Sequence, residues 1–489
     1  MNRPIFRLYV VVLLLFAGLV AFTSRWSVLE ADELRANSEN RRPLIEEQQI
    51  ARGSISTRDG VLIAESVGRG RGPQRVYVRR YPQGSLFGNP VGYSFVDRGR
   101  IGIELSENDL LSGERNEFAS LLDQVLNRKR AGDDITLTLD ANAQRVATEA
   151  LERALASTPG AEGGGAVVAI EPDTGAIRAM ASVPGFNPEE ARDEQRFEQL
   201  LEQGTASPLF NRATQATYEP GSTMKVVTAV AALDSGEFDT STVLNADSPK
   251  EISGAPLANS GGQSFGDIDM RTALTFSVNT YWAQVGEQLG AETYIEYMKR
   301  FGFYSDPPLD YPDNQMAPSG IYSEGRLIED PGRIDIGRVA IGQERLLVTP
   351  LQMAMVAATV ANGGELMRPT FLEEARDPDG RVVEKLDPER VRRVMSAQTA
   401  QAVTEMMTDV AREGTASGLS TRAGQLAGKT GTAEIDVEAR VNRPWFIGFA
   451  PADDPKIAVA AMLERCTGCS GGAVAGPIAT QVMDALAGG

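Results

Sequence analysis

The sequence predicts an α+β fold for the larger part of the chain, and the order of its strand and helix patterns is the reason. Apolar alternations separated by turn residues predict two hairpins, one early and one late, at 166–170 with 176–181 and at 445–450 with 457–463. Helical apolar spacing fills the region between them, at 224–233, 270–289, 350–361 and 399–412. Strands at both ends of a region are expected to share one antiparallel sheet, flanked by the helices between them.

An uncharged apolar segment near the N-terminus is the second feature. It runs from Leu8 to Phe22, and with its flanks it approaches the roughly 17 to 25 residues that span a bilayer. Basic residues precede it and acidic residues follow it, at Arg3, Arg7, Glu30, Asp32 and Glu33. The positive-inside rule then predicts a cytoplasmic tail at 1–7, a single transmembrane anchor at 8–23 in the cell membrane, and an exported remainder. A cleaved signal peptide is the alternative, but no clear small-x-small cleavage site follows the segment.

The exported part divides in two by composition. Residues 24–132 are rich in Arg, Gly and turn residues, with short apolar alternations such as Val76 to Val78. This pattern predicts a small, strand-containing N-terminal module, or pedestal. A strand at 135–139 and a helix at 141–156 then mark the entry to a larger domain at 133–489.

Composition excludes several kinds of function. With 48 basic against 66 acidic residues and a formal charge of −18, the chain is not expected to bind nucleic acid. It has no histidine, which removes a Ser-His-Asp triad and the commonest zinc ligand. Two cysteines alone, Cys466 and Cys469, make a poor structural zinc site. In an exported protein they favour a local disulfide, with two free thiols as the alternative.

A serine and a lysine three residues apart are the first candidates for chemistry. Ser222 follows Pro220 and Gly221 and precedes an apolar helical run, so we expect it near a helix N-terminus. Lys225 then lies one turn further on the same face, where its amine can reach the serine hydroxyl. Partial burial would lower the pKa of the lysine and make it a base. The alternative is a capping serine followed by a solvent-facing lysine.

Two later segments add polar groups that can meet at one cavity. Ser277 and Asn279 occupy alternate positions and can direct a hydroxyl and an amide the same way. The Lys-Thr-Gly-Thr segment at 429–432 has the pattern of an edge strand, in which Gly431 permits close approach to a ligand and Lys429 carries charge into a cleft. Each segment alone also has an ordinary structural explanation.

In this order the three segments resemble the Ser-x-x-Lys, Ser-x-Asn and Lys-Thr-Gly motifs of the penicillin-binding proteins and serine β-lactamases. Further segments resemble the class B, or monofunctional, penicillin-binding proteins, at 52–62, 100–104, 211–213, 341–343, 348–352 and 361–364. The short pedestal is most similar to the actinobacterial penicillin-binding protein A subfamily. The resemblance implies a transpeptidase fold of the penicillin-binding-protein and serine β-lactamase type at 133–489.

The resemblance also implies a role for each candidate residue. Ser222 would be the acylated nucleophile and Lys225 the base that removes its proton. Ser277 would relay a proton to the leaving D-alanine, while Asn279 would hydrogen-bond the substrate backbone. Lys429 would support the electrostatics around Ser277. The substrate carboxylate would meet the strand and its two threonine hydroxyls at Thr430, Gly431 and Thr432. Backbone N–H groups of Ser222 and Thr432 would form the oxyanion hole.

The implied activity is that of a peptidoglycan D,D-transpeptidase, which cross-links stem peptides of nascent glycan strands and is acylated by β-lactams. No metal or organic cofactor is implied. The implied protein partner is a membrane glycosyltransferase of the SEDS type. Two alternatives stay open: a D,D-carboxypeptidase or β-lactamase, in which water deacylates the serine, and a catalytically idle sensor or scaffold that only binds β-lactams.

Overall fold

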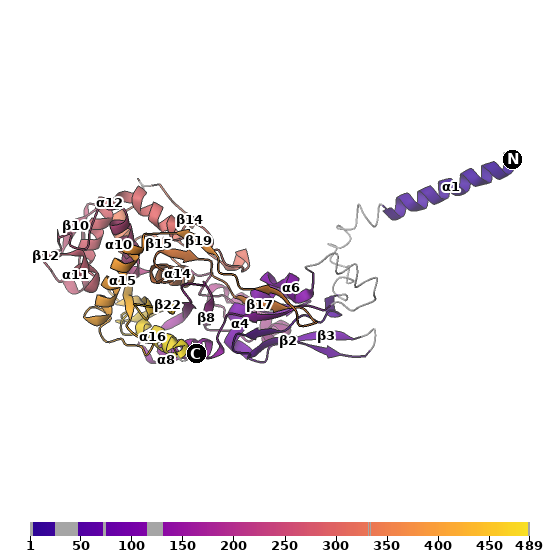
Figure 1. Ribbon diagram of the computed structural model, residues 1–489, viewed down its shortest axis with the longest axis horizontal. Coiled ribbons are helices and arrows are strands. Elements are labelled where there is room, and N and C mark those ends of the chain that lie inside the picture. Colours follow the sequence, from indigo (N-terminus) through magenta and orange to yellow (C-terminus); the bar gives the residue numbers. More distant parts are fainter. Residues whose placement is uncertain are drawn as a thin grey trace. The chain divides into compact units, whose positions relative to one another are not determined.

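The computed structural model describes residues 3–24, 47–71, 75–114, 131–330, 332 and 334–487 (Figure 1). The chain forms two compact units, residues 1–51 with 67–78 and residues 52–66 with 79–489. The acidic flank expected after the apolar segment, at Glu30, Asp32 and Glu33, lies outside the described residues. So do residues 25–46 and 115–130 of the expected pedestal.

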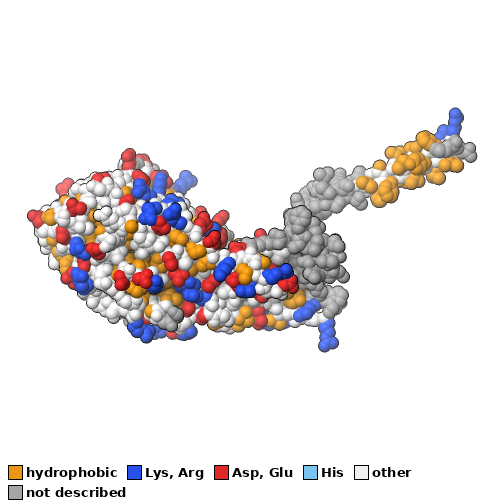
Figure 2. Space-filling view, in the orientation of Figure 1, with side chains coloured by type: hydrophobic (Ala, Val, Ile, Leu, Met, Phe, Trp, Pro, Cys, Tyr) orange, Lys and Arg blue, Asp and Glu red, His pale blue; other side chains and the backbone are white. Residues whose placement is uncertain are grey.

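The N-terminal apolar segment forms one helix, α1 (Arg3–Ser24). Hydrophobic side chains cover its surface in Figure 2, and those of Leu14 and Leu15 are 67% and 69% exposed. A helix that is apolar on all sides is typical of a membrane span or a protein core. By length and composition α1 can cross a bilayer, which agrees with the predicted anchor.

A five-stranded antiparallel sheet forms the centre of the second unit. Its strand order is β20-β21-β22-β7-β8, so the early hairpin and the late strands lie side by side as predicted. The strands are β7 (Glu162–Ile170), β8 (Ile177–Val183), β20 (Ala427–Asp436), β21 (Val441–Ala450) and β22 (Ile457–Thr467). β20, which carries the Lys-Thr-Gly-Thr segment, is an edge strand, so its outer side is open to a ligand or another element.

Helices cover this sheet in two groups. α8 (Ala141–Ser157) and α16 (Ala475–Leu486) pack on each other and on the sheet. α14 (Pro350–Ala361) packs on β22, β7 and β21, and α15 (Ala397–Arg412) packs on β20. In Figure 1, α14 and α16 lie on either side of β22. The helices predicted at 141–156, 350–361 and 399–412 are therefore confirmed.

Polar caps explain where these helices begin. The Asp140 side chain accepts a hydrogen bond from the backbone N–H of Ala143, and the Thr349 side chain accepts one from Gln352. Pro350 occupies the first helical position of α14, where its missing N–H costs nothing.

The single helix predicted at 270–289 is wrong, because the chain forms two helices there. α11 (Met270–Thr275) ends before Phe276, and α12 (Asn279–Arg300) begins at Asn279. Ser277, in the break, has a φ of +58°, which is incompatible with a continuous right-handed helix. Apolar spacing continues through the break and no glycine or proline marks it, so the sequence pattern does not reveal it.

The N-terminal module is organised around a six-stranded sheet of order β18-β17-β6-β1-β2-β3. Its strands are β1 (Ile55–Thr57), β2 (Leu62–Arg69), β3 (Val76–Arg80), β6 (Asp134–Leu137), β17 (Leu372–Arg376) and β18 (Val382–Lys385). β6 pairs parallel with β1 and antiparallel with β17. The strand expected to open the larger domain thus belongs to the pedestal sheet, and the expected boundary between residues 132 and 133 divides strands that share one sheet.

A buried carboxylate holds the start of this module together. Glu104 is fully buried and pairs with Arg52 at 2.9 Å and with Arg79 at 2.6 Å, while the Tyr81 hydroxyl donates to it at 3.0 Å. Burial opposes ionisation of Glu104, but the two arginines outweigh it and hold its pKa below the usual value. The class B-like segments at 52–62 and 100–104 therefore meet through an internal ion pair.

The remaining elements are short: η3 (Gly84–Phe87), α4 (Gly88–Val91), β4 (Ser94–Phe95), β5 (Gly99–Arg100), α5 (Ile103–Ser106), α6 (Asn108–Ser112), η4 (Pro188–Arg192), α9 (Glu194–Glu202), η5 (Gly204–Ala206), η6 (Gly221–Met224), α10 (Lys225–Asp234), β9 (Leu244–Asn245), β10 (Lys250–Ile252), β11 (Ala255–Leu257), η7 (Ser260–Gly262), β12 (Asp267–Ile268), η8 (Asp313–Gln315), β13 (Gly320–Ser323), β14 (Arg326–Leu327), α13 (Ile336–Val339), β15 (Leu346–Leu347), β16 (Glu365–Met367) and β19 (Arg390–Arg393).

Candidate active site

Ser222 lies on the short 3-10 turn η6, which leads directly into helix α10. Gly221, just before it, has a φ of +54°, and a Cβ at that position would lie 2.9 Å from the backbone nitrogen of Ala433 on β20. Glycine alone accepts both the left-handed conformation and this approach without strain. The Pro-Gly pair noted in the sequence therefore places the partly buried Ser222 beside the edge strand.

Gly431 completes this contact from β20. A Cβ on Gly431 would lie 2.7 Å from the carbonyl oxygen of Pro220 and 2.9 Å from Cγ2 of Thr223. The sequence predicts that Gly431 permits close approach of a ligand; in the structure it permits close approach of the strand to the Ser222 turn. Lys429, two residues earlier on the same face of β20, is fully buried.

The hydroxyl of Ser277 joins the two lysines. The Lys225 amine donates to the Ser277 hydroxyl at 3.2 Å and to its carbonyl oxygen at 2.8 Å, while the Lys429 amine donates to the same hydroxyl at 2.9 Å. Lys225 also donates to Oδ1 of Asn279 at 2.7 Å. The structure thus brings the three motifs together at one point. Among the described residues, the hydrogen bonds of Lys225 go to Ser277 and Asn279 rather than to the Ser222 hydroxyl.

Burial perturbs both amines. Removal from water lowers the pKa of Lys225 well below its usual value, and the nearby charge of Lys429 lowers it further. Burial also lowers the pKa of Lys429, to about 7. The predicted depression of the Lys225 pKa by burial is confirmed in direction. A lowered pKa increases the share of the neutral Lys225 amine, the form that can accept a proton, and proton acceptance is the task that the sequence proposed for it.

The segment before Ser222 is held by side chains that the sequence did not point to. The indole N–H of Trp445 donates to the Glu219 carbonyl oxygen at 2.9 Å, and Arg443 pairs with the Glu219 carboxylate. The Tyr218 hydroxyl donates to Glu464 at 2.7 Å. Because these partners lie on β21 and β22, the central sheet fixes the position of the Ser222 turn.

Both threonine hydroxyls of the Lys-Thr-Gly-Thr segment also have partners. The Thr430 and Thr415 hydroxyl oxygens lie 2.6 Å apart in a hydrogen bond. The Thr432 hydroxyl accepts a hydrogen bond from the Gly471 backbone N–H at 3.2 Å. Sequence reasoning missed Thr415 and Gly471, because neither belongs to a motif with a recognisable spacing.

The two cysteines form a disulfide between Cys466, at the end of β22, and Cys469 in the loop that follows. Their Cα atoms lie 5.9 Å apart, within the usual range for such a bond. The hypothesis of a local disulfide is therefore confirmed over that of free thiols.

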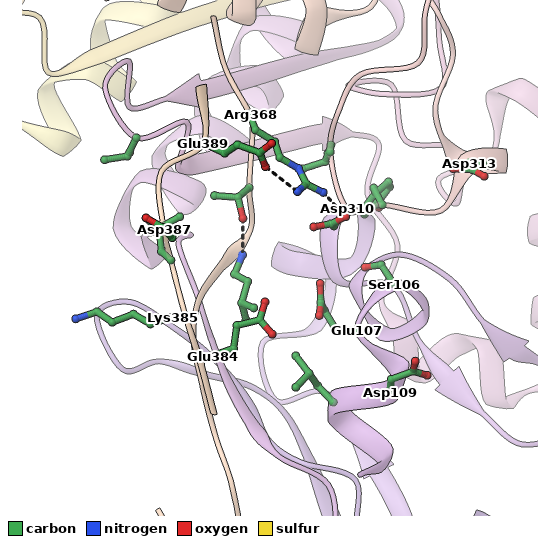
Figure 3. A pocket seen from close by; sticks show the side chains of 17 residues that line it. Ser106, Glu107, Asp109, Asp310, Asp313, Arg368, Glu384, Lys385, Asp387 and Glu389 are labelled. Atoms are coloured by element: carbon green, nitrogen blue, oxygen red, sulfur yellow. Dashed lines mark hydrogen bonds and ion pairs between the residues drawn. The ribbon is translucent and has the colours of Figure 1, made fainter. Parts of the chain in front are cut away.

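A separate cavity of about 560 Å³ is lined by many carboxylate side chains together with Arg368 and Lys385 (Figure 3). Arg368 bonds to Asp310 and Glu389 across it, and further carboxylates, including Glu107 and Asp109, line its wall. None of the predicted site residues lines this cavity. Within the described part of the chain, no group of three or more His, Cys, Asp and Glu side chains is placed to hold a metal ion.

Comparison with known families agrees with this geometry. Residues 165–484 match the penicillin binding protein transpeptidase domain, and residues 52–135 match the penicillin binding protein A dimerisation domain. The chain is 35% identical to the peptidoglycan D,D-transpeptidase PbpA of Mycolicibacterium smegmatis, with 99% of each chain covered. It is 30% identical to the peptidoglycan D,D-transpeptidase MrdA of Acinetobacter baumannii, covering 83% of this chain and 65% of that one.

Solved structures of penicillin-binding proteins are also similar to this chain. The fold is similar to that of penicillin-binding protein A from Mycobacterium tuberculosis in its ceftriaxone acyl-enzyme complex, with a TM-score of 0.78 and 31% identity. The match covers 90% of this chain and 99% of that one. The penicillin G acyl-enzyme complex of the same protein matches with a TM-score of 0.77 and 32% identity, over 89% of this chain and 99% of that one.

Proposed function

This chain belongs to the class B penicillin-binding proteins, and from that premise we propose that it cross-links peptidoglycan stem peptides through an acyl-enzyme formed on Ser222. Relatives that match over 99% of both chains are named peptidoglycan D,D-transpeptidases. Related structures hold β-lactams as acyl-enzymes. The chain is accordingly a serine-type D-Ala-D-Ala transpeptidase that β-lactams acylate.

One observation supports the residue roles: the Ser277 hydroxyl lies between two buried lysine amines beside the Ser222 turn. Lys225 accepts the proton of the Ser222 hydroxyl as its oxygen attacks the carbonyl carbon of the penultimate D-alanine. The proton passes from Lys225 through Ser277 to the amine of the departing terminal D-alanine. An amine from a second stem peptide then attacks the ester on Ser222 and restores the free serine.

The remaining residues hold the substrate. Asn279 accepts a hydrogen bond from Lys225 at Oδ1 and donates one from Nδ2 to the Ala258 carbonyl oxygen. These two bonds fix its amide, which hydrogen-bonds the substrate backbone. Thr430 and Thr432 offer hydroxyls to the terminal carboxylate. The backbone N–H groups of Ser222 and Thr432 form the oxyanion hole, since η6 and β20 lie against each other there.

Hydrolysis is the competing fate of the acyl-enzyme. If water replaces the acceptor amine, the same site performs D,D-carboxypeptidase or β-lactamase chemistry. Release of D-alanine from a stem-peptide analogue, measured with and without an added amine acceptor, separates transfer from hydrolysis. Cross-linked product that depends on the amine supports the transpeptidase.

We further propose that α1 anchors the chain with its N-terminus in the cytoplasm and the catalytic domain outside. Arg3 and Arg7, before the apolar segment, support this orientation. Cross-linking requires freshly polymerised glycan strands as substrates. We therefore propose a membrane glycosyltransferase of the SEDS type as the partner that supplies them.

The decisive experiment for the site is labelling with fluorescent penicillin. We expect the wild type to be labelled and Ser222→Ala to be unlabelled. Lys225→Arg should label poorly, because a guanidinium is always charged and cannot act as a base. Ser157→Ala, at an exposed serine on α8, is the matched control and should label fully. Labelling of a folded Ser222→Ala variant would refute the assignment.

A further inference from the structure

The disulfide closes a short turn, residues 466–469, at the end of β22 and just before the segment that reaches β20. Cys466 is fully buried at the end of β22, and Cys469 is 8% exposed. Two residues after Cys469 the chain reaches Gly471 and Gly472, and helix α16 begins at Ala475. The disulfide therefore ties the short approach to α16 back onto the central sheet.

The segment that follows this turn contacts β20 and β21 through backbone atoms. A Cβ on Gly471 would lie 2.4 Å from the Gly431 carbonyl oxygen and 2.1 Å from that of Trp445. A Cβ on Gly472 would lie 2.6 Å from the Thr415 carbonyl oxygen. Side chains at either glycine would push the loop away from the Lys-Thr-Gly-Thr segment, so the position of the loop and that of the strand depend on each other.

Further hydrogen bonds hold the disulfide-closed turn to β21. Nδ2 of Asn442 donates to the Cys469 carbonyl oxygen at 2.8 Å, and the Gly468 N–H donates to the Arg440 carbonyl oxygen at 2.8 Å. The turn is thus fixed at Gly468 and at Cys469. Its last contact toward the site is the Gly471 N–H, which donates to the Thr432 hydroxyl at 3.2 Å.

That last bond determines what the Thr432 hydroxyl can do. A hydroxyl carries one hydrogen to donate and two lone pairs that accept. Since the Thr432 oxygen accepts from Gly471, its hydrogen stays free to turn toward an anionic acceptor. A substrate carboxylate needs such a donor, because it can only accept hydrogen bonds when ionised.

We propose that the Cys466–Cys469 disulfide is a positioning element for substrate carboxylate recognition: it fixes the Gly471 N–H, which orients the Thr432 hydroxyl. The inference rests on the proposed function, because it assigns Thr432 to the carboxylate. Reduction by a dithiol such as dithiothreitol breaks the S–S bond, adds two electrons and two protons to give two thiols, and oxidises the reagent to its cyclic disulfide. The loop then loses its tie to β22, and the carboxylate loses an oriented donor.

The test is a double-mutant cycle on penicillin acylation. The wild type is compared with three variants: Cys466→Ser/Cys469→Ser, Thr432→Val and the triple variant. For each protein, the dependence of the labelling rate on penicillin concentration gives the binding constant and the acylation rate at saturation separately. We expect loss of the disulfide to weaken binding roughly tenfold, the size expected for a hydrogen bond to a charged group. The acylation rate at saturation should change little. In the Thr432→Val background, loss of the disulfide should have no further effect on binding.

Reduction of the folded wild type by dithiothreitol provides a second route if the serine variant does not fold. It should reproduce the binding defect, with alkylation and mass measurement verifying two thiols, and should not affect the serine variant. Equal effects of disulfide loss with and without the Thr432 hydroxyl would overturn the proposal. So would a lower melting temperature with unchanged binding. Absence of labelling in the untreated wild type would instead count against the proposed function.

Discussion

At Ser277 two buried lysine amines share one hydroxyl, so their protonation states depend on each other. Burial lowers the pKa of Lys429 to about 7 and that of Lys225 well below its usual value, with the Lys429 charge adding to the second shift. Placing two charges in one dry site is unfavourable. A cationic Lys429 therefore favours the neutral form of Lys225, and we expect Lys225 to lose its proton first and Lys429 second.

This order predicts a bell-shaped pH dependence of acylation by penicillin. The second-order rate constant should rise with pH as Lys225 loses its proton, because only the neutral amine can act as a base. It should fall again near pH 7 as Lys429 loses the charge that supports the site. Stopped-flow labelling across this range measures both limbs.

Lys429→Arg provides the control for the descending limb. A guanidinium stays charged at all accessible pH values, so the variant should label more slowly but lose the decline above neutrality. A variant that keeps the same descending limb would show that another group causes it. Circular dichroism at each pH verifies that the protein remains folded.

The sequence predicts some site residues and misses others for a physical reason. Ser222 and Lys225 are neighbours in one helical turn, so their spacing alone predicts their proximity. Thr415 and Thr430 meet across 15 residues, and Tyr218 and Glu464 across 246. Contacts of that kind follow from the packing of β20 and β22 and leave no periodic signal in the chain.

At the scale of elements, helix caps and apolar spacing predict the bounds of a helix correctly where both signals mark the same start. The cap at Thr349 and the proline after it mark the start of α14, and the predicted range of that helix matches the observed one. The break at Ser277 gave no such signal, because a left-handed serine is imposed by its surroundings. Strand partners were also hidden, since the alternation in β6 does not say that its neighbours are β1 and β17.

The contact between β20 and η6 predicts a strong effect for Gly431→Ala. The added methyl group would approach the Pro220 carbonyl oxygen to 2.7 Å, and backbone cannot rotate away as a side chain can. We expect β20 to move from the Ser222 turn, slowing acylation about 100-fold, as small misplacements of reacting groups do. The loss of stability should be about 1 to 3 kcal/mol, as for an overpacked core.

Gly418→Ala is the matched control, because a Cβ there meets no atom within 4 Å. It should label at the wild-type rate and unfold at the wild-type denaturant concentration. Fluorescent penicillin kinetics and urea denaturation measure the two quantities. Wild-type acylation by Gly431→Ala would show that the close approach of strand and turn has no part in the reaction.

At the scale of the whole molecule, the chain combines an apolar helix long enough to cross a bilayer with a catalytic unit that needs a polymeric substrate. The segments around Arg52 and Glu104 are unsuitable probes of a partner surface, because their side chains pair with each other inside the pedestal. Removing one side of such a buried pair costs roughly 3 to 5 kcal/mol and reports on folding. The helix α1 is the better probe, since its side chains have no protein core to support.

We therefore predict that exchanging residues 5–23 for an unrelated transmembrane helix lowers co-purification with a SEDS-type glycosyltransferase from detergent, while penicillin labelling is retained. Small residues such as Ala17 and Gly18 allow close helix packing. Gly18→Leu in the native helix should therefore also lower the amount of glycosyltransferase that co-purifies. Glu104→Gln, in contrast, should lower the melting temperature of the unit that contains the catalytic site. Equal recovery of the glycosyltransferase by the wild type and both helix variants would show that α1 only tethers the enzyme. No recovery by any of them would remove the proposed partner and leave the transpeptidase assignment standing on its own.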